Sequence, residues 1–370
     1  MTYIKLYVTN KPAWSRSKGG AVIIASDGNH HNLALAACFR FYCTVLLLAA
    51  IASAASGQQQ KRLQPPAAVQ SPFNAMKVSA RFKIGKNADW VAVTADAVWV
   101  AGTSPYSILR IDPKTNVVAA KIELPGEACS GLATGFHSVW IPLCGKPNSL
   151  ARLDMRTNKL VILPIGPAGE GGGIATSVDS VWLVSDDNGT LNRIDPRTNL
   201  VRQKISILPG SYNPIHSKGK IWVTSVKSNS VTAVDASTGA VIKTIPVGPQ
   251  PRFLTAGGGS IWTLNQGDGT VTRVDESKLN VAATVPARIP GHGGDITYGY
   301  GSIWATVFGT PLTRIDAKSN KLLRQWTGAG GDSLRIGFAS IWITDYRNGL
   351  RLRIPLTQAM HAGRRRSVRR

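Results

Sequence analysis

Short apolar runs alternate with clusters of glycine, proline and polar residues along most of this chain, and the alternation has a period. Tryptophan marks each period, at spacings of 38 to 42 residues, in phrases such as "SVWLVS" and "SIWITD". These tryptophans are Trp99, Trp140, Trp182, Trp222, Trp262, Trp304 and Trp342. A second phrase, "RIDPKTN" or a variant of it, follows in six of the seven periods, and a third apolar run comes after it.

Each period predicts four strands, which we term A to D. In the fifth period they are "RFLTAG", "SIWTLN", "VTRVD" and "AATVPA". Alternating polarity and β-branched residues favour strands over helices. Four strands in about 40–45 residues is the spacing of a propeller blade. The sequence therefore predicts an all-β fold, a seven-bladed β-propeller with four-stranded blades.

The ends of the repeat predict how the ring closes. The seventh period has strands A, B and C ("LRIGFA", "SIWITD", "LRLRIP") and then the pattern stops. A spare strand, "SARFKIG" (Ser79 to Gly85), precedes the first strand A. Joining the two covers two exposed edges, so we expect this N-terminal strand to complete the last blade.

The segment "IWVTSVKSNSVTAVDASTGAVIKTIPVG" (Ile221 to Gly248) resembles the YVTN-type β-propeller repeat. The resemblance extends over about residues 79–356. The superfamily includes streptogramin B lyase-like proteins and other exported propellers. The resemblance implies ligand binding at the face that carries the D–A and B–C loops, around the ring axis. It is specific for the fold and much less so for activity.

The flanking segments differ in composition from the repeat. Residues 1–57 predict a leader with an export signal. Arg40 precedes the apolar run Phe41 to Ala55, and Ala52 to Ala54 resembles a cleavage site. The run is short for a membrane span, although an uncleaved anchor is the alternative. We expect a true start downstream of Met1, a signal peptide over about residues 33–57, a periplasmic or secreted protein, and no membrane span in the mature form.

Three further segments complete the predicted organisation. Residues 58–77 are rich in Gln, Pro, Ala and Ser and predict a flexible linker. The propeller is expected over residues 78–357. Residues 358–370 end in "GRRRSVRR" and predict a basic disordered tail. The formal charge of +23 allows binding to nucleic acid or another anionic polymer or surface, although no basic stripe with interleaved aromatic residues is present.

Residues that recur in every blade are predicted to be structural. The recurring aspartates open the turn between strands C and D, where a carboxylate accepts backbone N–H bonds. They are Asp112, Asp154, Asp195, Asp235, Asp275 and Asp316. The tryptophans are expected to pack between sheets. A binding site should lie where the blades differ.

The predicted ligand-binding rim consists of residues that enter strand A or end strand B and vary among blades. They are Asp89, Trp90, Glu127, Glu170, Tyr212, Arg252, His292, Asp332, Arg335 and Tyr346. His292, Asp295 and Asp345 are the candidates for catalysis, with His292 as a general base near Asp295. This mixture of acidic, basic and aromatic groups suits a small polar ligand or a protein partner. His216, within strand A of blade four, is expected to be packed rather than catalytic.

The resemblance to streptogramin lyases implies a His in "P-H-[AG]-I", a Glu three residues after the strand B tryptophan, and a magnesium ion. Of the seven residues that stand three positions after a repeated tryptophan, only Asp345 is a carboxylate. His292 lies two residues before the position that the lyase His would occupy. We expect no metal site and no cofactor, with magnesium only if the chain is a lyase. No nucleophile elbow, zinc spacing, P-loop or dinucleotide fingerprint occurs.

The leading interpretation is an exported, monomeric, non-enzymatic propeller that binds a ligand or partner through this loop-bearing face. A divalent-metal-dependent lyase or hydrolase that uses the same face is the alternative, and anionic polymer binding is the second alternative.

Two cysteines in the repeat region predict a disulfide. Cys129 enters strand A of blade two and Cys144 ends strand B. Placing the hairpin centre between Phe136 and His137 sets the two cysteines directly opposite each other, within disulfide reach. Two thiols cannot complete a structural zinc site, and they lack the C-x-x-C redox spacing. We therefore expect a Cys129–Cys144 bond in an oxidising compartment.

Overall fold

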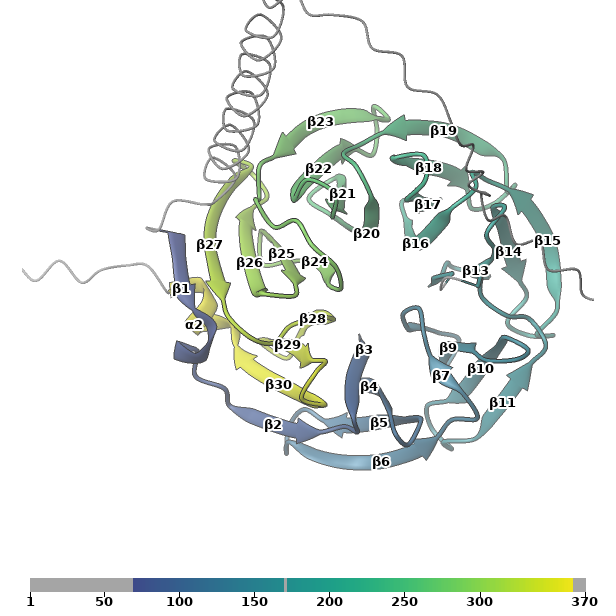
Figure 1. The fold of residues 1–370 in the computed structure, drawn as a ribbon. Helices are drawn as coiled ribbons and strands as arrows, with labels where there is room; N and C mark the ends of the chain where they lie inside the picture. The colour runs from purple at the N-terminus through teal and green to yellow at the C-terminus, as the bar shows by residue number, and fades with distance from the viewer. Residues whose placement is uncertain (1–68, 170–171, 362–370) are drawn as a thin grey trace, which may run out of the picture. The chain divides into compact units, whose positions relative to one another are not determined.

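Seven sheets, each built on four antiparallel strands A to D, form a ring in the computed structural model, with strand A innermost and strand D toward the outside (Figure 1). The structure describes residues 69–169 and 172–361, within one compact unit of the chain, Leu63–Arg370. The leader predicted over residues 1–57 lies outside the described residues. The prediction of a seven-bladed β-propeller is confirmed.

The blades are numbered in chain order, and strand A lies innermost in each. Blades one and two contain β3 (Asn87–Val93), β4 (Val98–Thr103), β5 (Ser107–Asp112) and β6 (Val117–Glu123), then β7 (Glu127–Ala128), β8 (Ala133–Gly135), β9 (Ser138–Cys144), β10 (Ser149–Asp154) and β11 (Leu160–Leu163). Blades three and four contain β12 (Ile174–Thr176), β13 (Val181–Asp186), β14 (Thr190–Ile194) and β15 (Val201–Ser206), then β16 (Ser211–Ser217), β17 (Lys220–Ser225), β18 (Ser230–Asp235) and β19 (Val241–Pro246).

Blades five to seven complete the ring. Blades five and six contain β20 (Pro251–Gly257), β21 (Ser260–Asn265), β22 (Thr270–Asp275) and β23 (Asn280–Val285), then β24 (Asp295–Gly299), β25 (Ser302–Val307), β26 (Thr310–Asp316) and β27 (Lys321–Thr327). Blade seven contains β28 (Leu334–Gly337), β29 (Ser340–Asp345), β30 (Leu350–Pro355) and β2 (Ala80–Lys83).

Burial falls from strand B to strand D. All six residues of β21 are buried, whereas β23 in the same sheet is largely exposed. Strand B packs against the neighbouring blades on both of its faces, while strand D forms the outer edge of the ring. All seven repeated tryptophans have no exposed area, which confirms their predicted packing role.

An arginine in strand C stacks on the strand B tryptophan in six of the seven blades. In blade seven, Arg353 lies 5.0 Å from the Trp342 ring centroid. It also donates to the Pro113 carbonyl at 2.6 Å and to the Asn116 side chain at 2.7 Å, both in blade one. The repeated arginine therefore contributes to the scaffold, as a cation–π partner and as a contact between blades.

The repeated aspartates have the predicted turn role. The Asp235 carboxylate accepts the amide hydrogens of Ser237 and Thr238, both at 2.9 Å, and the Asp275 carboxylate does the same for Ser277 and Lys278. Bonds from the Ser237 hydroxyl and these two amides lower the pKa of Asp235 to about 2. These carboxylates are engaged in turn geometry, which accounts for their recurrence.

The ring closes as expected. Strand β2 pairs antiparallel with β30, with Phe82 opposite Arg351. Phe82 is buried, and its ring stacks on Trp342 with the centroids 6.0 Å apart. The N-terminal strand therefore supplies both backbone bonds and core packing to the last blade.

The segments that flank the ring are more ordered than predicted. Residues 70–75, expected within a linker, form β1 (Gln70–Pro72) and the short 3-10 helix η2 (Phe73–Ala75). Strand β1 pairs in parallel with β27 (Figure 1). The side chain of Phe73, in η2, is buried. These contacts cover an outer sheet edge and an apolar side chain, so the linker prediction is wrong for this segment.

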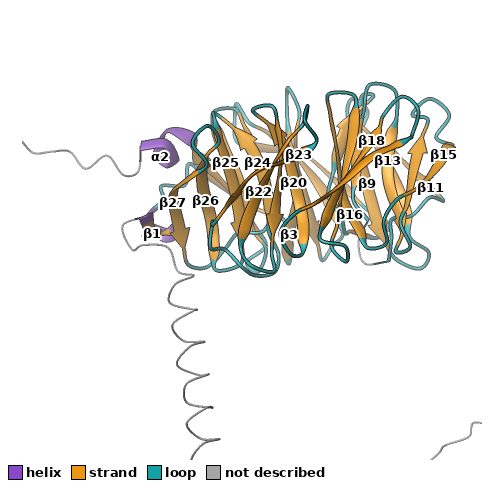
Figure 2. Ribbon diagram, turned by 90° about the horizontal axis from the view of Figure 1, so that it is seen from above, coloured by secondary structure: helices purple, strands orange, loops and turns teal. Residues whose placement is uncertain are grey.

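The prediction of a disordered tail is also wrong for its first residues, 358–361. Residues 356–361 form α2 (Leu356–His361), which lies at the edge of the ring (Figure 2) and packs against β29 and β30 of blade seven. Its Met360 carbonyl accepts a hydrogen bond from Arg314 of blade six at 3.1 Å. Its Leu356 and Ala359 side chains are buried, and this apolar packing keeps the chain ordered beyond strand C of blade seven. Among the described residues, no helix is long and apolar enough to cross a membrane.

Candidate functional site

Strand A begins at the face with the D–A and B–C loops, which we call the loop face; the opposite face is the turn face. Three positions before the residue paired with the repeated tryptophan, blades one to seven carry Asp89, Ser130, Gly172, Tyr212, Arg252, Gly294 and Asp332. The next position carries Trp90, Gly131, Gly173, Asn213, Phe253, Asp295 and Ser333. Carboxylates therefore gather where blades six, seven and one meet.

Asp89 and Asp332 form a carboxyl pair at this junction. Their side chains are hydrogen-bonded to each other, and Asp332 also accepts the Gly294 amide at 2.8 Å. Burial and then the charge and hydrogen bond of Asp332 raise the pKa of Asp89 well above 3.8. Burial also raises the pKa of Asp332. The pair therefore holds a shared proton at pH values where an exposed aspartate is ionised.

Asp295 lies beside the pair but has different partners. Its carboxylate accepts from the Ser333 hydroxyl at 3.1 Å and the Leu334 amide at 3.2 Å, and it forms an ion pair with Arg335. His292, in the preceding loop, is exposed, and its carbonyl accepts a hydrogen bond from the Phe308 amide at 3.3 Å. Within the described residues, no bond joins the His292 ring to Asp295, so their expected acid–base pairing has no support in the geometry.

Arg351 is the residue that the sequence analysis missed. Its position in strand C holds an aliphatic residue in the other six blades: Ile108, Leu150, Leu191, Val231, Val271 and Leu312. Arg351 has no exposed area, donates to the Ser333 carbonyl at 3.4 Å, and leaves Nε and Nη2 without a partner in the described part of the chain. Burial lowers the pKa of the Arg351 guanidinium well below its ordinary value. The break in the aliphatic pattern was a signal that could have found it.

Aromatic side chains meet across the ring axis. Trp90 of blade one and Phe253 of blade five have ring centroids 6.1 Å apart, and Tyr212 of blade four lies 5.9 Å from Phe253. The Arg252 guanidinium lies 4.3 Å from the Tyr212 centroid. These contacts fill the axis with side chains near the loop face.

The other predicted rim residues are more dispersed. Burial, followed by the charges of Asp89 and Glu127, raises the pKa of Tyr346, whose side chain bonds to Asn87. Glu127 is partly buried at the start of β7. Glu170 lies outside the described residues. His216, expected to be packed, is partly buried, and desolvation lowers its pKa.

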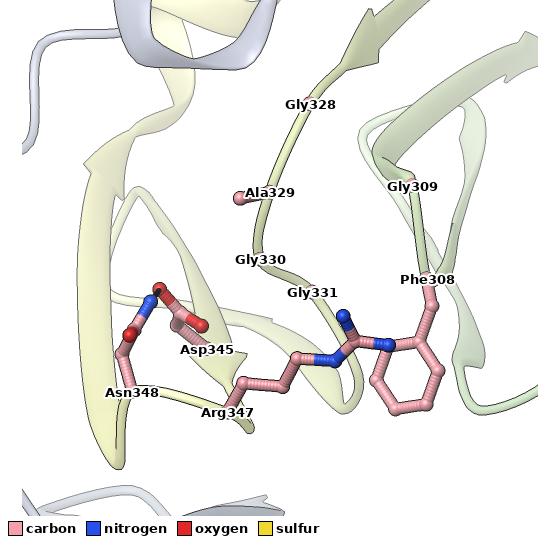
Figure 3. Close-up of a pocket in the computed structure, with 9 residues that line it drawn as sticks. All are labelled: Phe308, Gly309, Gly328, Ala329, Gly330, Gly331, Asp345, Arg347 and Asn348. Atoms are coloured by element: carbon pink, nitrogen blue, oxygen red, sulfur yellow. Dashed lines mark hydrogen bonds between the residues drawn. The ribbon is translucent and has the colours of Figure 1, made fainter.

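A pocket of about 510 Å³ opens beside this junction, between the loops of blades six and seven (Figure 3). The glycine-rich D–A loop, Gly328 to Gly331, forms its central wall. Phe308 lies on one side, and Asp345 with Asn348 lies on the other. The Arg347 guanidinium reaches across to the Phe308 ring and lies 5.5 Å from its centroid.

Asp345 is only partly satisfied within this pocket. Its Oδ2 accepts from the Asn348 side chain at 2.8 Å, while Oδ1 is buried and has no partner among the described residues. The positive φ of Gly330 (105°) and Gly331 (84°) allows the wall to run close to Asp345 and Thr306. A Cβ on Gly331 would come within 2.5 Å of the Thr306 hydroxyl. The glycines therefore make room for the pocket.

The residues present do not fit a magnesium site of the lyase kind. Among the described residues, no three His, Cys, Asp or Glu side chains are grouped so that they could hold a metal ion. Asp345 brings a single carboxylate to the pocket, and Asp89 and Asp332 are bonded to each other.

The predicted disulfide joins Cys129 and Cys144, with their Cα atoms 5.7 Å apart. The predicted direct opposition is wrong. Cys144 pairs with Glu127, and the Cys129 amide instead donates to the Pro142 carbonyl at 3.2 Å. The register shifts by two residues between β7 and β8, so the bond runs diagonally across the strands. It still ties strand A to strand B at the loop face.

Solved structures with the same fold can now be compared. A streptogramin B lyase structure has a TM-score of 0.63 at 16% identity and covers 74% of this chain and 96% of its own. Virginiamycin B lyase from Staphylococcus aureus gives 0.63 at 14% identity, covering 75% and 98%. BamB from Moraxella catarrhalis gives 0.54 at 11% identity, covering 75% and 99%.

The chain has the fold of these propellers. The resemblance to the superfamily of streptogramin B lyase-like proteins is thereby confirmed for the architecture, while identities this low carry no activity with them. No family model and no curated protein matches the sequence.

Proposed function

We propose that this propeller is a binding module whose ligand occupies the pocket between blades six and seven. The observation that carries the proposal is that one pocket presents both an acidic side chain, Asp345, and a basic side chain, Arg347. A hydrogen bond from a ligand to the Asp345 carboxylate would contribute about 1.5–3 kcal/mol.

The lining indicates the chemistry of the ligand. Asp345 suits an ammonium group, Arg347 suits a carboxylate, and the Phe308 ring offers an apolar surface. A volume of about 510 Å³ lies in the range of small-molecule sites. The ligand that fits is zwitterionic and about the size of a short peptide. Of the two expected ligand classes, it is closer to a small polar ligand than to a protein partner. No observation favours the lyase alternative over this one.

Isothermal titration of the full chain with a glycine–phenylalanine dipeptide tests the proposal. We expect saturable binding that weakens at least about tenfold for Asp345→Asn, since a charge-assisted bond contributes about 1.5–3 kcal/mol. Acetylation of the dipeptide amine should have the same effect. Asp187→Asn, an exposed carboxylate on the same face, is the control. Equal affinity of the wild type for the free and the acetylated dipeptide, or no binding, would contradict the proposal.

We further propose that the module works in the periplasm or outside the cell. The apolar run after Arg40 supports export, and the Cys129–Cys144 bond supports an oxidising compartment. Fractionation of cells that express the full chain, with N-terminal sequencing of the product, tests this. A product that stays in the cytoplasm with its leader intact would contradict it.

A further inference from the structure

The exposed apolar side chains of this propeller gather toward its turn face. Twelve large apolar side chains are exposed in the described part of the chain, and Tyr106 is the only one of them that lies in a loop of the loop face. The other eleven lie in the A–B turns, in the C–D turns or within the first three residues of a strand D. Strand D starts at the turn face and forms the outside of the ring (Figure 1). We call these eleven side chains the apolar belt.

The apolar belt recurs at the same place in blades one to six. It includes Val117 and Val241, which begin strand D in blades one and four and are 56% and 47% exposed. Leu200, in the C–D turn of blade three, is 66% exposed. The A–B turns add Val178 of blade three, 87% exposed, and Tyr300 of blade six, 59% exposed. Isolated apolar residues are common on protein surfaces, but a set concentrated on one face marks a contact with a partner or a membrane.

Basic side chains flank the apolar belt. Exposed lysines and arginines lie in the C–D turns of five blades, and each precedes an exposed aliphatic residue of its blade by at most five positions. Examples are "KTNVV" (Lys114 to Val118) and "KSNKLL" (Lys318 to Leu323). Among the described residues, Arg197 is the only one of these bases in an ion pair, with Asp195 at 3.6 Å. The bases are Lys114, Arg156, Lys159, Arg197, Lys278 and Lys318.

The acidic residues of the turn face do not cancel these charges. The six repeated aspartates are matched in number by the six strand C arginines that stack on tryptophan. The turns hold three further acidic residues: Asp96 and Asp179 pair with two of those arginines, and Glu276 pairs with Lys218. The first residues of β17 and β27 are also lysines. With the six bases of the C–D turns included, basic residues outnumber acidic ones at this face by fifteen to nine.

We propose that the turn face docks on a bilayer of anionic lipid, with the apolar belt among the headgroups and the basic side chains on the lipid phosphates. Lysine and arginine beside exposed aliphatic residues is the composition by which proteins bind membrane interfaces. A soluble anionic polymer would contact the bases but leave the apolar belt in water, so the aliphatic residues favour a bilayer. The pocket between blades six and seven lies in loops of the opposite face, so it stays open while the turn face is docked.

Titration of the full chain with vesicles of phosphatidylglycerol and phosphatidylcholine in equal parts, followed by flotation, tests the proposal. We expect binding that weakens as the salt concentration rises, and at least about tenfold weaker binding to vesicles of phosphatidylcholine alone. Val178→Ser combined with Leu200→Ser should weaken the affinity for anionic vesicles at least about fivefold. Arg156→Gln combined with Lys159→Gln should weaken it at least about tenfold.

Matched changes on the loop face are the controls. Tyr106→Ser, and Lys146→Gln combined with Lys227→Gln, alter exposed residues of the B–C loops and should leave vesicle affinity unchanged. Every protein carries the same leader and the same C-terminal arginines, so a difference between variants belongs to the substituted face. An unchanged affinity in the Val178 and Leu200 variant would assign the face to a soluble anionic polymer and overturn the proposal. Absence of vesicle binding, or an equal loss in the loop-face variants, would also overturn it, whatever the outcome of the dipeptide titration.

Discussion

Asp89 of blade one and Asp332 of the loop into blade seven are hydrogen-bonded through their carboxyl groups. The first and last blades meet at this point, so the pair lies at the seam of the ring. A shared proton is required, because two ionised carboxylates this close repel each other. Stability at the seam therefore depends on pH.

Asp89→Asn should remove this dependence. The folded pKa of Asp89 is raised above its unfolded value, so the folded chain binds more protons than the unfolded chain between about pH 4 and the raised pKa. The wild type is thus most favoured below that window and loses up to about 1.4 kcal/mol per pH unit as the pH rises through it. Urea unfolding of both proteins at several pH values measures the difference. The difference in free energy of unfolding between the wild type and Asp89→Asn should change with pH, whereas that between the wild type and the exposed Asp187→Asn control should stay constant. A constant difference for Asp89→Asn as well would contradict the shared proton.

Arg351→Leu should stabilise the protein. The substitution restores the aliphatic residue found in the other blades and removes a buried guanidinium, two of whose nitrogens lack a partner within residues 69–169 and 172–361. We expect the free energy of unfolding to rise by about 1–3 kcal/mol. Arg353→Leu, two residues along the same strand, should lower it, because Arg353 stacks on Trp342 and bonds to blade one. Chemical denaturation with an unchanged m-value measures both; a loss of stability in Arg351→Leu would mean that unseen partners hold the guanidinium.

Phe82→Ala should weaken ring closure. Phe82 is the aromatic side chain through which β2 packs on Trp342, and truncation of a buried Phe costs about 3–5 kcal/mol. The free energy of unfolding measures this loss. Phe308→Ala, a partly buried ring at the pocket rim, is the comparison and should cost clearly less. Equal losses would indicate that β2 does not hold the ring closed.

Peptide mapping without reductant should recover Cys129 and Cys144 in one linked peptide pair. The double substitution to serine should lower the free energy of unfolding by about 3 kcal/mol, the entropy expected for a loop of 15 residues. Both peptides recovered as free thiols from protein purified under oxidising conditions would refute the bond.

The repeat determined most of the architecture because it is local. Within each blade, the repeated tryptophan marks strand B, and the aspartate that recurs in six blades marks the turn after strand C. The last blade has no strand D after Leu350–Pro355, and this gap predicted the closure by β2. The cysteine pairing also followed from neighbouring strands, although the two-residue register shift between β7 and β8 did not.

Only the tertiary structure decided which varying residues act together. Asp89, Asp295, Asp332 and Arg351 come from three blades, and no spacing in the sequence measures the angle at which those blades meet. Packing in the closed ring brings Asp89 and Asp332 into a hydrogen bond and Asp295 into an ion pair with Arg335. It also buries one polar atom each of Trp90 and Asp345 without a partner among the described residues. Hydrogen bonds and desolvation act over a few ångströms, so these relationships appear only once the ring has closed.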